Sequence, residues 1–224
     1  MAEFVFLSEK NRERYLKIIA PVGGLFAKTG IHPNVLTVTG FFLSILAAFL
    51  YSAGAFFWAA WVVVIAGTCD ALDGQIARLT RKNTPFGAFF DSTLDRYSDM
   101  FLLLGLAYYY SGGRAFLEIP GAAPAGEASP WTVVILILAL TGSFMVSYAR
   151  ARAEGLGIQC RSGMMQRPER VTLLIIGSLL GAAPLVGPVM MKCTLWALAL
   201  STNMTAIHRI LHVRNEMSKE NVLR

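Results

Sequence analysis

Residues 70–95 read DALDGQIARLTRKNTPFGAFFDSTLD, and this stretch decides how the rest of the chain is interpreted. All five aspartates of the chain lie in it or just beyond it: Asp70, Asp73, Asp91, Asp95 and Asp99. The first two are three residues apart and the next two are four apart, so each pair shares one face of a helix. Four carboxylates from neighbouring helices would repel one another unless cations lay between them. Ligands of oxygen alone favour Mg²⁺, Mn²⁺ or Ca²⁺ over zinc or copper.

The residues around these acids suit a phosphate-bearing ligand. Gly74 and Ala77 share a helical face with the first pair of aspartates, and Gly87 precedes Asp91 by one turn, which leaves room against the backbone. Small residues also serve ordinary packing in membranes, so they are weaker evidence than the acids. Arg78 offers a planar donor group for phosphate. The alternative is a set of ion pairs at helix ends, but four acids at these spacings favour metal binding.

Outward from this stretch, the composition indicates an integral membrane protein. The chain has 224 residues, of which 55% are hydrophobic and 15% charged, against about 25% charged in an average soluble domain. Residues 33–69 hold no charged side chain, a run long enough for two crossings at about 20 residues each. Soluble enzymes, disordered chains and disulfide scaffolds are therefore excluded. The odd count of three cysteines has no metal-ligand spacing and predicts neither disulfides nor zinc.

The predicted fold is all-α, a single domain over 1–224 with six transmembrane helices. The expected spans are 33–53, 55–79, 87–110, 130–152, 169–186 and 190–211, which form one bundle over 33–211. This topology places 18 of the 20 basic residues on one side, so the positive-inside rule predicts that both termini are cytoplasmic. An amphipathic helix over 8–28 is expected to lie in the membrane interface, and residues 212–224 form a cytoplasmic tail. The net charge of +6 then reflects cytoplasmic loops and anionic lipids rather than nucleic acid.

The spacing Asp-x2-Asp-Gly-x2-Ala-Arg-x8-Gly-x3-Asp-x3-Asp over residues 70–95 resembles the signature of the CDP-alcohol phosphotransferase family. The resemblance implies a six-helix membrane fold, a CDP-linked donor, two divalent ions (Mg²⁺, with Mn²⁺ possible) and a homodimer. The aspartates lie toward the cytoplasmic ends of the second and third predicted spans, so we expect the active site at the cytoplasmic face of the cell membrane. The resemblance assigns the metal to Asp70, Asp73, Asp91 and Asp95, with Asp95 also as general base. Asp99 lies outside the signature and is expected to support the site or pair helices rather than to bind metal.

Three further segments, at 147–154 (SYARARAE), 166–170 (QRPER) and 209–214, resemble the prokaryotic phosphatidylinositol phosphate synthases of that family. This resemblance implies transfer of a phosphatidyl group from CDP-diacylglycerol to inositol 1-phosphate, with release of CMP. The residues matched to the acceptor phosphate are Arg150, Arg167, Arg170 and Arg209, the first often a lysine in those enzymes. The start of the first span resembles their nucleotide-contacting segment, and the residues expected to bind the CDP-lipid are Asn34, Val35, Leu36, Thr37, Gly74, Ala77, Arg78, Thr84 and Gly87.

Four alternatives remain open from the sequence. The acceptor could be glycerol 3-phosphate, as in phosphatidylglycerophosphate synthases, and the lipid tails could be archaeal diethers. A transporter would also hold acids within a membrane, but it would place them near the midplane rather than at the cytoplasmic ends of helices. A non-catalytic membrane scaffold gives no reason for the spacing of the acids.

Overall fold

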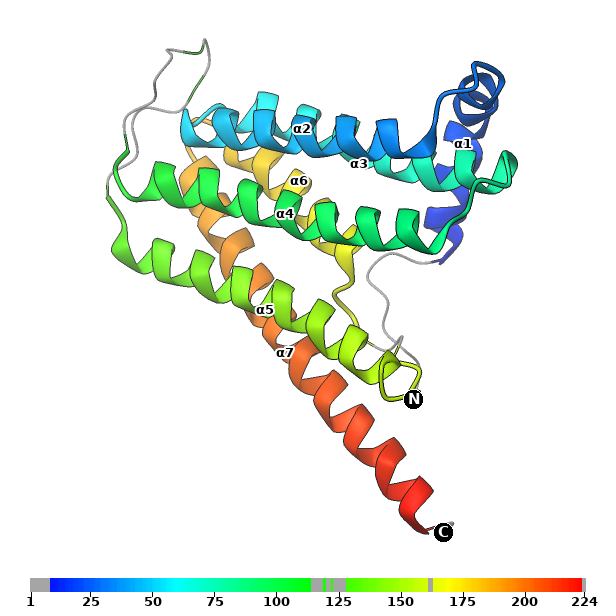
Figure 1. Ribbon diagram of the computed structural model, residues 1–224. Helices are drawn as coiled ribbons and strands as arrows, with labels where there is room; N and C mark the ends of the chain where they lie inside the picture. The colour runs from blue at the N-terminus through cyan, green and yellow to red at the C-terminus, as the bar shows by residue number, and fades with distance from the viewer. Residues whose placement is uncertain (1–8, 114–118, 120–121, 123–127, 161–162, 223–224) are drawn as a thin grey trace.

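The computed structural model describes residues 9–113, 119, 122, 128–160 and 163–222, and its regular secondary structure is entirely helical (Figure 1). This confirms the all-α class. The seven helices are α1 Glu9–Lys28, α2 Pro33–Ser52, α3 Phe56–Leu79, α4 Pro85–Tyr110, α5 Pro130–Glu154, α6 Arg167–Gly181 and α7 Gly187–Val222. By length and composition, α2, α3 and α5 are able to cross a membrane.

Proline is the first or second residue of five of these helices, α2, α4, α5, α6 and α7. Proline suits the first turn because its fixed φ is helical and its missing N–H would have no helical partner there. At α4 the Thr84 hydroxyl also caps the helix by accepting a hydrogen bond from the Gly87 amide at 3.0 Å. Since the signature residues follow directly, this capped start sets the position of the aspartates on α4.

Two helix ends differ from the predicted boundaries by five residues or more, and the other boundaries differ by three or fewer. α6 ends at Gly181, before the Pro184 turn, whereas the predicted span continues to residue 186. α7 continues through the segment predicted as a cytoplasmic tail and reaches Val222, because no glycine or proline interrupts residues 189–222. Most of the predicted linker over 111–130 lies outside the described residues.

The helices pack in two groups, which are joined through α6 and through the contact of α4 with α5. α2 lies against both α3 and α4, α5 runs along α7, and α6 contacts α3 and α7 (Figure 1). The Tyr51 hydroxyl of α2 and the Ser178 hydroxyl of α6 are hydrogen-bonded at 2.7 Å inside the core, where both side chains are fully buried. α1 crosses the end of α3 that carries the aspartates. The bundle therefore brings the ends of α3, α4, α5 and α6 around one region.

Close approach of α2 and α4 depends on Gly105. A Cβ atom at this position would collide with the backbone of Ala48, including its carbonyl oxygen. We expect Gly105→Val to lower the free energy of unfolding by ~1–3 kcal/mol, the usual cost of overpacking, in unfolding measurements on the detergent-solubilised protein. Gly67→Ala is the matched control, because a Cβ there meets nothing within 4 Å. Equal stability of the two variants would show that α4 shifts freely against α2.

Candidate active site

Three of the four predicted metal ligands form a carboxylate cluster. Asp70 of α3 and Asp91 and Asp95 of α4 each offer an oxygen, and these atoms all lie within 4.8 Å of one another. The Oδ1 atom of Asp91 is buried and has no hydrogen-bond partner among the described residues. An orphaned carboxylate oxygen among other carboxylates is costly unless a cation binds it. The donor set therefore fits a hard divalent cation.

Asp73 is held slightly apart from this cluster. Its side chain is buried, and its Oδ2 accepts a hydrogen bond of 2.6 Å from the Thr37 hydroxyl of α2. The structure does not group its oxygens with those of the other three. The contact fastens α2 to α3 beside the cluster, and the role of Asp73 as a ligand stays a prediction.

Arg167, the first residue of α6, lies against the cluster. Its Nη1 is 2.8 Å from Asp70 Oδ1 and 2.8 Å from Asp95 Oδ1, and its Nε is 3.7 Å from Asp99 Oδ1. The sequence predicted this arginine as a phosphate ligand but not its contacts with the carboxylates. A phosphate bound by Arg167 would therefore lie beside the carboxylate cluster.

The residues predicted to bind the CDP-lipid surround the beginnings of α2 and α4 and the end of α3. A Cβ atom on Gly87 would lie 3.0 Å from Thr84 Oγ1 and 3.7 Å from Asn34 Oδ1, so these three residues meet. On α3 the guanidinium of Arg78 lies over Gly74, where a Cβ would be 3.6 Å from its Nη1. Polar side chains and glycines that leave the backbone accessible thus lie together at these helix ends, and such groups suit a diphosphate.

Three other residues of that set differ in exposure. Leu36 is buried and belongs to a small core with Ile19, Leu72 and Ile76. Val35 is exposed and Ala77 is half-buried. The packing explains Leu36 as a core residue between α1, α2 and α3, and its contact with the donor stays a prediction.

A cavity of about 560 Å³ adjoins the cluster, between α4, α5, α6 and α7. Its lining includes all four arginines predicted to bind the acceptor phosphate: Arg150, Arg167, Arg170 and Arg209. Sequence reasoning missed two further charged residues of the lining, Arg96 and Glu154. Glu154 follows Arg150 by four residues and accepts its Nε–H at 2.9 Å, a spacing that could have revealed it.

The charges around this cavity favour an anion. Five arginines face three carboxylates (Asp95, Asp99 and Glu154), which leaves a net formal charge of +2. Of the three residues of the carboxylate cluster, Asp95 lines the cavity, and Asp70 and Asp91 do not. A phosphorylated ligand in the cavity would therefore be balanced by the excess of arginines and would lie beside one member of the carboxylate cluster, Asp95.

The four arginines are held differently. Arg150 is about half exposed, whereas Arg170 is buried and donates to Asp99 from Nη2 at 2.8 Å. Arg209 is buried too and donates to the carbonyl of Val146 on α5. Arg150 thus has the greatest freedom to contact a ligand. Arg167 is held by its ion pairs with the aspartates, and Arg170 and Arg209 are fixed in the wall.

The sequence of the chain is similar to those of known membrane-lipid enzymes. Residues 30–205 match the model of the CDP-alcohol phosphatidyltransferase family. Over 206 residues the chain is 32% identical to the phosphatidylinositol phosphate synthase of Mycolicibacterium smegmatis, covering 91% of the chain and 87% of that protein. It is 36% identical over 180 residues to the archaetidylinositol phosphate synthase of Methanothermobacter thermautotrophicus, covering 80% and 82%.

Solved structures show the same fold. The phosphatidylinositol phosphate synthase of Mycobacterium tuberculosis with CDP-DAG bound has a TM-score of 0.74 and 30% identity, covering 88% of this chain and 94% of that one. The same enzyme in complex with manganese and citrate has a TM-score of 0.72 at 30% identity, covering 86% and 87%. The match to the family model spans the aspartate signature and five of the seven helices from end to end. The chain belongs to the CDP-alcohol phosphatidyltransferase family.

Proposed function

We propose that the protein transfers the phosphatidyl group of CDP-diacylglycerol to inositol 1-phosphate, forming phosphatidylinositol phosphate and CMP. One observation carries the proposal: Asp95 belongs both to the carboxylate cluster and to the lining of the cationic cavity, and Arg167 of the same lining forms ion pairs with Asp70 and Asp95 of the cluster. A donor diphosphate at the cluster and an acceptor phosphate in the cavity would therefore meet at these two residues. The relatives named above catalyse, by name, synthesis of inositol-phosphate lipids.

In the proposed reaction, a hydroxyl oxygen of inositol 1-phosphate attacks the phosphorus that carries the diacylglycerol. A new P–O bond forms, the bond to the CMP oxygen breaks, and the electron pair leaves with CMP. Asp95 faces the cavity and accepts the hydroxyl proton as general base. Asn34, Thr84, Gly87 and Arg78 orient the donor, and the arginines of the cavity bind the acceptor phosphate.

The metal would be held by Asp70, Asp91 and Asp95, with Asp73 as a proposed fourth ligand. Two Mg²⁺ ions, with Mn²⁺ as a substitute, would neutralise the diphosphate and the developing charge on the attacking and leaving oxygens. The oxygen-only ligand set and the manganese complex of the Mycobacterium tuberculosis enzyme support this choice.

For the membrane, we propose six crossings near the predicted spans, with the active site and both termini on the cytoplasmic side of the cell membrane. The family and the three apolar helices identify a membrane protein. On α1 the side chains of Ile18, Val22 and Leu25 are exposed and recur at helical spacing, which supports an interfacial helix. A homodimer is proposed from the family resemblance.

Family membership excludes the transporter and the scaffold, because the family consists of transferases.

Diether lipid tails are a second candidate for the donor. The archaetidylinositol phosphate synthases of Methanothermobacter thermautotrophicus and Pyrococcus horikoshii are 36% and 32% identical to this chain, as similar as the bacterial enzymes. Glycerol 3-phosphate is the other acceptor to be tested.

The acceptor is tested by incubating the purified protein in detergent with CDP-diacylglycerol, Mg²⁺ and one acceptor at a time. We expect CMP release and a phosphatidylinositol phosphate product by mass spectrometry with inositol 1-phosphate, and no product with free inositol. Without phosphate, the cavity arginines would lack the charge-assisted bonds that bind the acceptor. Equal use of inositol and inositol 1-phosphate would contradict the assignment, and preference for glycerol 3-phosphate would redefine the substrate.

A further inference from the structure

Asp99 lies one turn beyond the family signature and outside the carboxylate cluster, and the reaction proposed above gives it no role. Its carboxylate lies between two arginines of α6. Oδ2 is 2.8 Å from Arg170 Nη2, and Oδ1 is 3.7 Å from Arg167 Nε. The Asp99 side chain is only 12% exposed. One buried carboxylate thus faces two guanidinium groups that share the cavity wall.

We propose that Asp99 is a positioning residue for the acceptor phosphate: its carboxylate holds Arg167 and Arg170 side by side on the cavity wall. The identity of the acceptor in this proposal rests on the proposed function. Arg167 and Arg170 are three residues apart on α6, so their like charges are neighbours and repel. A carboxylate between them offsets that repulsion and lets both guanidinium groups face the cavity.

Asp99 also connects two helices whose backbones are far apart. No Cα atom of α4 lies within 8 Å of one of α6. Side chains therefore bridge the gap between these two described helices, and the pair of Asp99 with Arg170 is the shorter of the two ion pairs that Asp99 makes. These links orient Arg167 and Arg170 of α6 toward α4, while the helix itself packs against α3 and α7.

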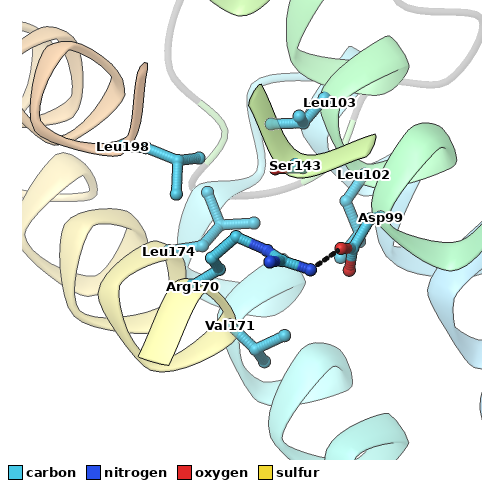
Figure 2. Close-up of a pocket in the computed structure, with 8 residues that line it drawn as sticks. All are labelled: Asp99, Leu102, Leu103, Ser143, Arg170, Val171, Leu174 and Leu198. Atoms are coloured by element: carbon cyan, nitrogen blue, oxygen red, sulfur yellow. Dashed lines mark hydrogen bonds and ion pairs between the residues drawn. The ribbon is translucent and has the colours of Figure 1, made fainter. Parts of the chain in front are cut away.

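The surroundings of the ion pair leave Arg170 few other partners. Figure 2 shows its guanidinium directed at Asp99, with leucines of three helices around the pair. A cavity of about 20 Å³ behind the pair is lined mainly by apolar side chains. Besides Asp99, Arg170 reaches the Met165 carbonyl at 3.4 Å, and its Nε has no partner among the described residues. Without Asp99 the charge of Arg170 would be buried and uncompensated, so its side chain would leave this position.

If Asp99 acted only through its charge, its removal would strengthen phosphate binding, whereas a positioning role predicts weaker binding. Removing the charge of Asp99 would raise the net charge around the cavity from +2 to about +3, which on Coulombic grounds strengthens phosphate binding. If Asp99 positions the arginines, its removal weakens phosphate binding instead. The sign of the change therefore separates the two roles.

The first test compares the steady-state kinetics of Asp99→Asn and Asp99→Ala with the wild type. We expect the KM for inositol 1-phosphate to rise by about 10-fold to 100-fold, the range expected for loss of a buried charge-assisted hydrogen bond. The KM for CDP-diacylglycerol should stay within about twofold, because both ion pairs of Asp99 are with arginines assigned to the acceptor, Arg167 and Arg170. Glu216→Gln is the control, since it breaks the exposed ion pair of Glu216 with Lys219, far along α7.

The second test asks whether Asp99 acts through Arg170. If it does, Asp99→Ala and Arg170→Ala should not be additive, and the double variant should show about the acceptor KM of Arg170→Ala alone. The double variant also removes both buried charges, so it stays informative if Asp99→Ala alone fails to fold. An acceptor KM that falls or stays unchanged in Asp99→Asn, or fully additive effects, would overturn the proposal.

A binding measurement keeps this proposal separate from the proposed function. Calorimetric titration of the full-length protein with inorganic phosphate, without CDP-diacylglycerol, should show weaker binding to Asp99→Asn than to the wild type. If the wild type does not use inositol 1-phosphate but this difference is found, the acceptor assignment fails and the role of Asp99 stands. Equal phosphate affinities would contradict the role of Asp99 whatever the acceptor is.

Discussion

Replacing Asp91 with asparagine is expected to abolish turnover while leaving the protein folded. Metal ions that stabilise both attacking and leaving oxygens contribute several kcal/mol, so loss of a ligand should lower kcat by on the order of 10³-fold or more. Asp91 is the sharpest site for this test. Arg167 forms ion pairs with Asp70 and Asp95, and among the described residues it forms none with Asp91. The substitution thus removes a ligand and leaves those ion pairs in place.

The measurements are CMP release and binding of Mn²⁺, followed by electron paramagnetic resonance. Asp91→Asn should bind Mn²⁺ more weakly and melt near the wild-type temperature in detergent, because removing one of several crowded anions relieves repulsion. Asp70→Asn should lose activity similarly but also free one contact of Arg167. Glu216→Gln controls for loss of a carboxylate outside the site. Full activity of Asp91→Asn, or of the wild type after exhaustive chelation, would contradict metal-assisted transfer.

The local part of the site was predictable from sequence because its geometry is set within single helices. The spacings of Asp70 with Asp73, and of Asp91 with Asp95, place each pair on one face, and prolines at positions 33, 85, 130 and 168 mark the starts of helices. The structure brings three of the four predicted ligands, Asp70, Asp91 and Asp95, together across two helices and does not group Asp73 with them.

The long-range part could not be predicted, because it depends on how helices pack. Arg167 follows Asp70 by 97 positions, and nothing in the spacing says that one guanidinium nitrogen lies 2.8 Å from both Asp70 and Asp95. The pairing of Asp99 with Arg170 has the same origin, since it joins α4 to α6. The contact of Thr37 with Asp73 likewise follows from packing of α2 on α3.

Asp95 is the carboxylate whose loss should act most directly on the chemical step. It lines the cavity of about 560 Å³ in which we propose that the acceptor binds, whereas the other described members of the cluster, Asp70 and Asp91, do not. A group at the boundary between the two substrates can reach the attacking hydroxyl. We expect Asp95→Asn to lower kcat by about 10²–10⁴-fold, the usual contribution of a general base, with nearly unchanged affinity for CDP-diacylglycerol.

The contact of Arg167 with Asp95 shapes the design of this experiment. Asparagine at position 95 loses the charge that Arg167 Nη1 faces at 2.8 Å, so acceptor binding changes as well. Rates are therefore compared at saturating inositol 1-phosphate, and donor affinity is measured separately by equilibrium binding.

Asp91→Asn is the matched variant, because it removes a carboxylate of the same cluster that does not line the cavity. If Asp95→Asn reproduced Asp91→Asn, with the loss seen as weaker binding of Mn²⁺ and donor, Asp95 would be a metal ligand only. A lower kcat with Mn²⁺ binding closer to wild type would show that the base faces the acceptor.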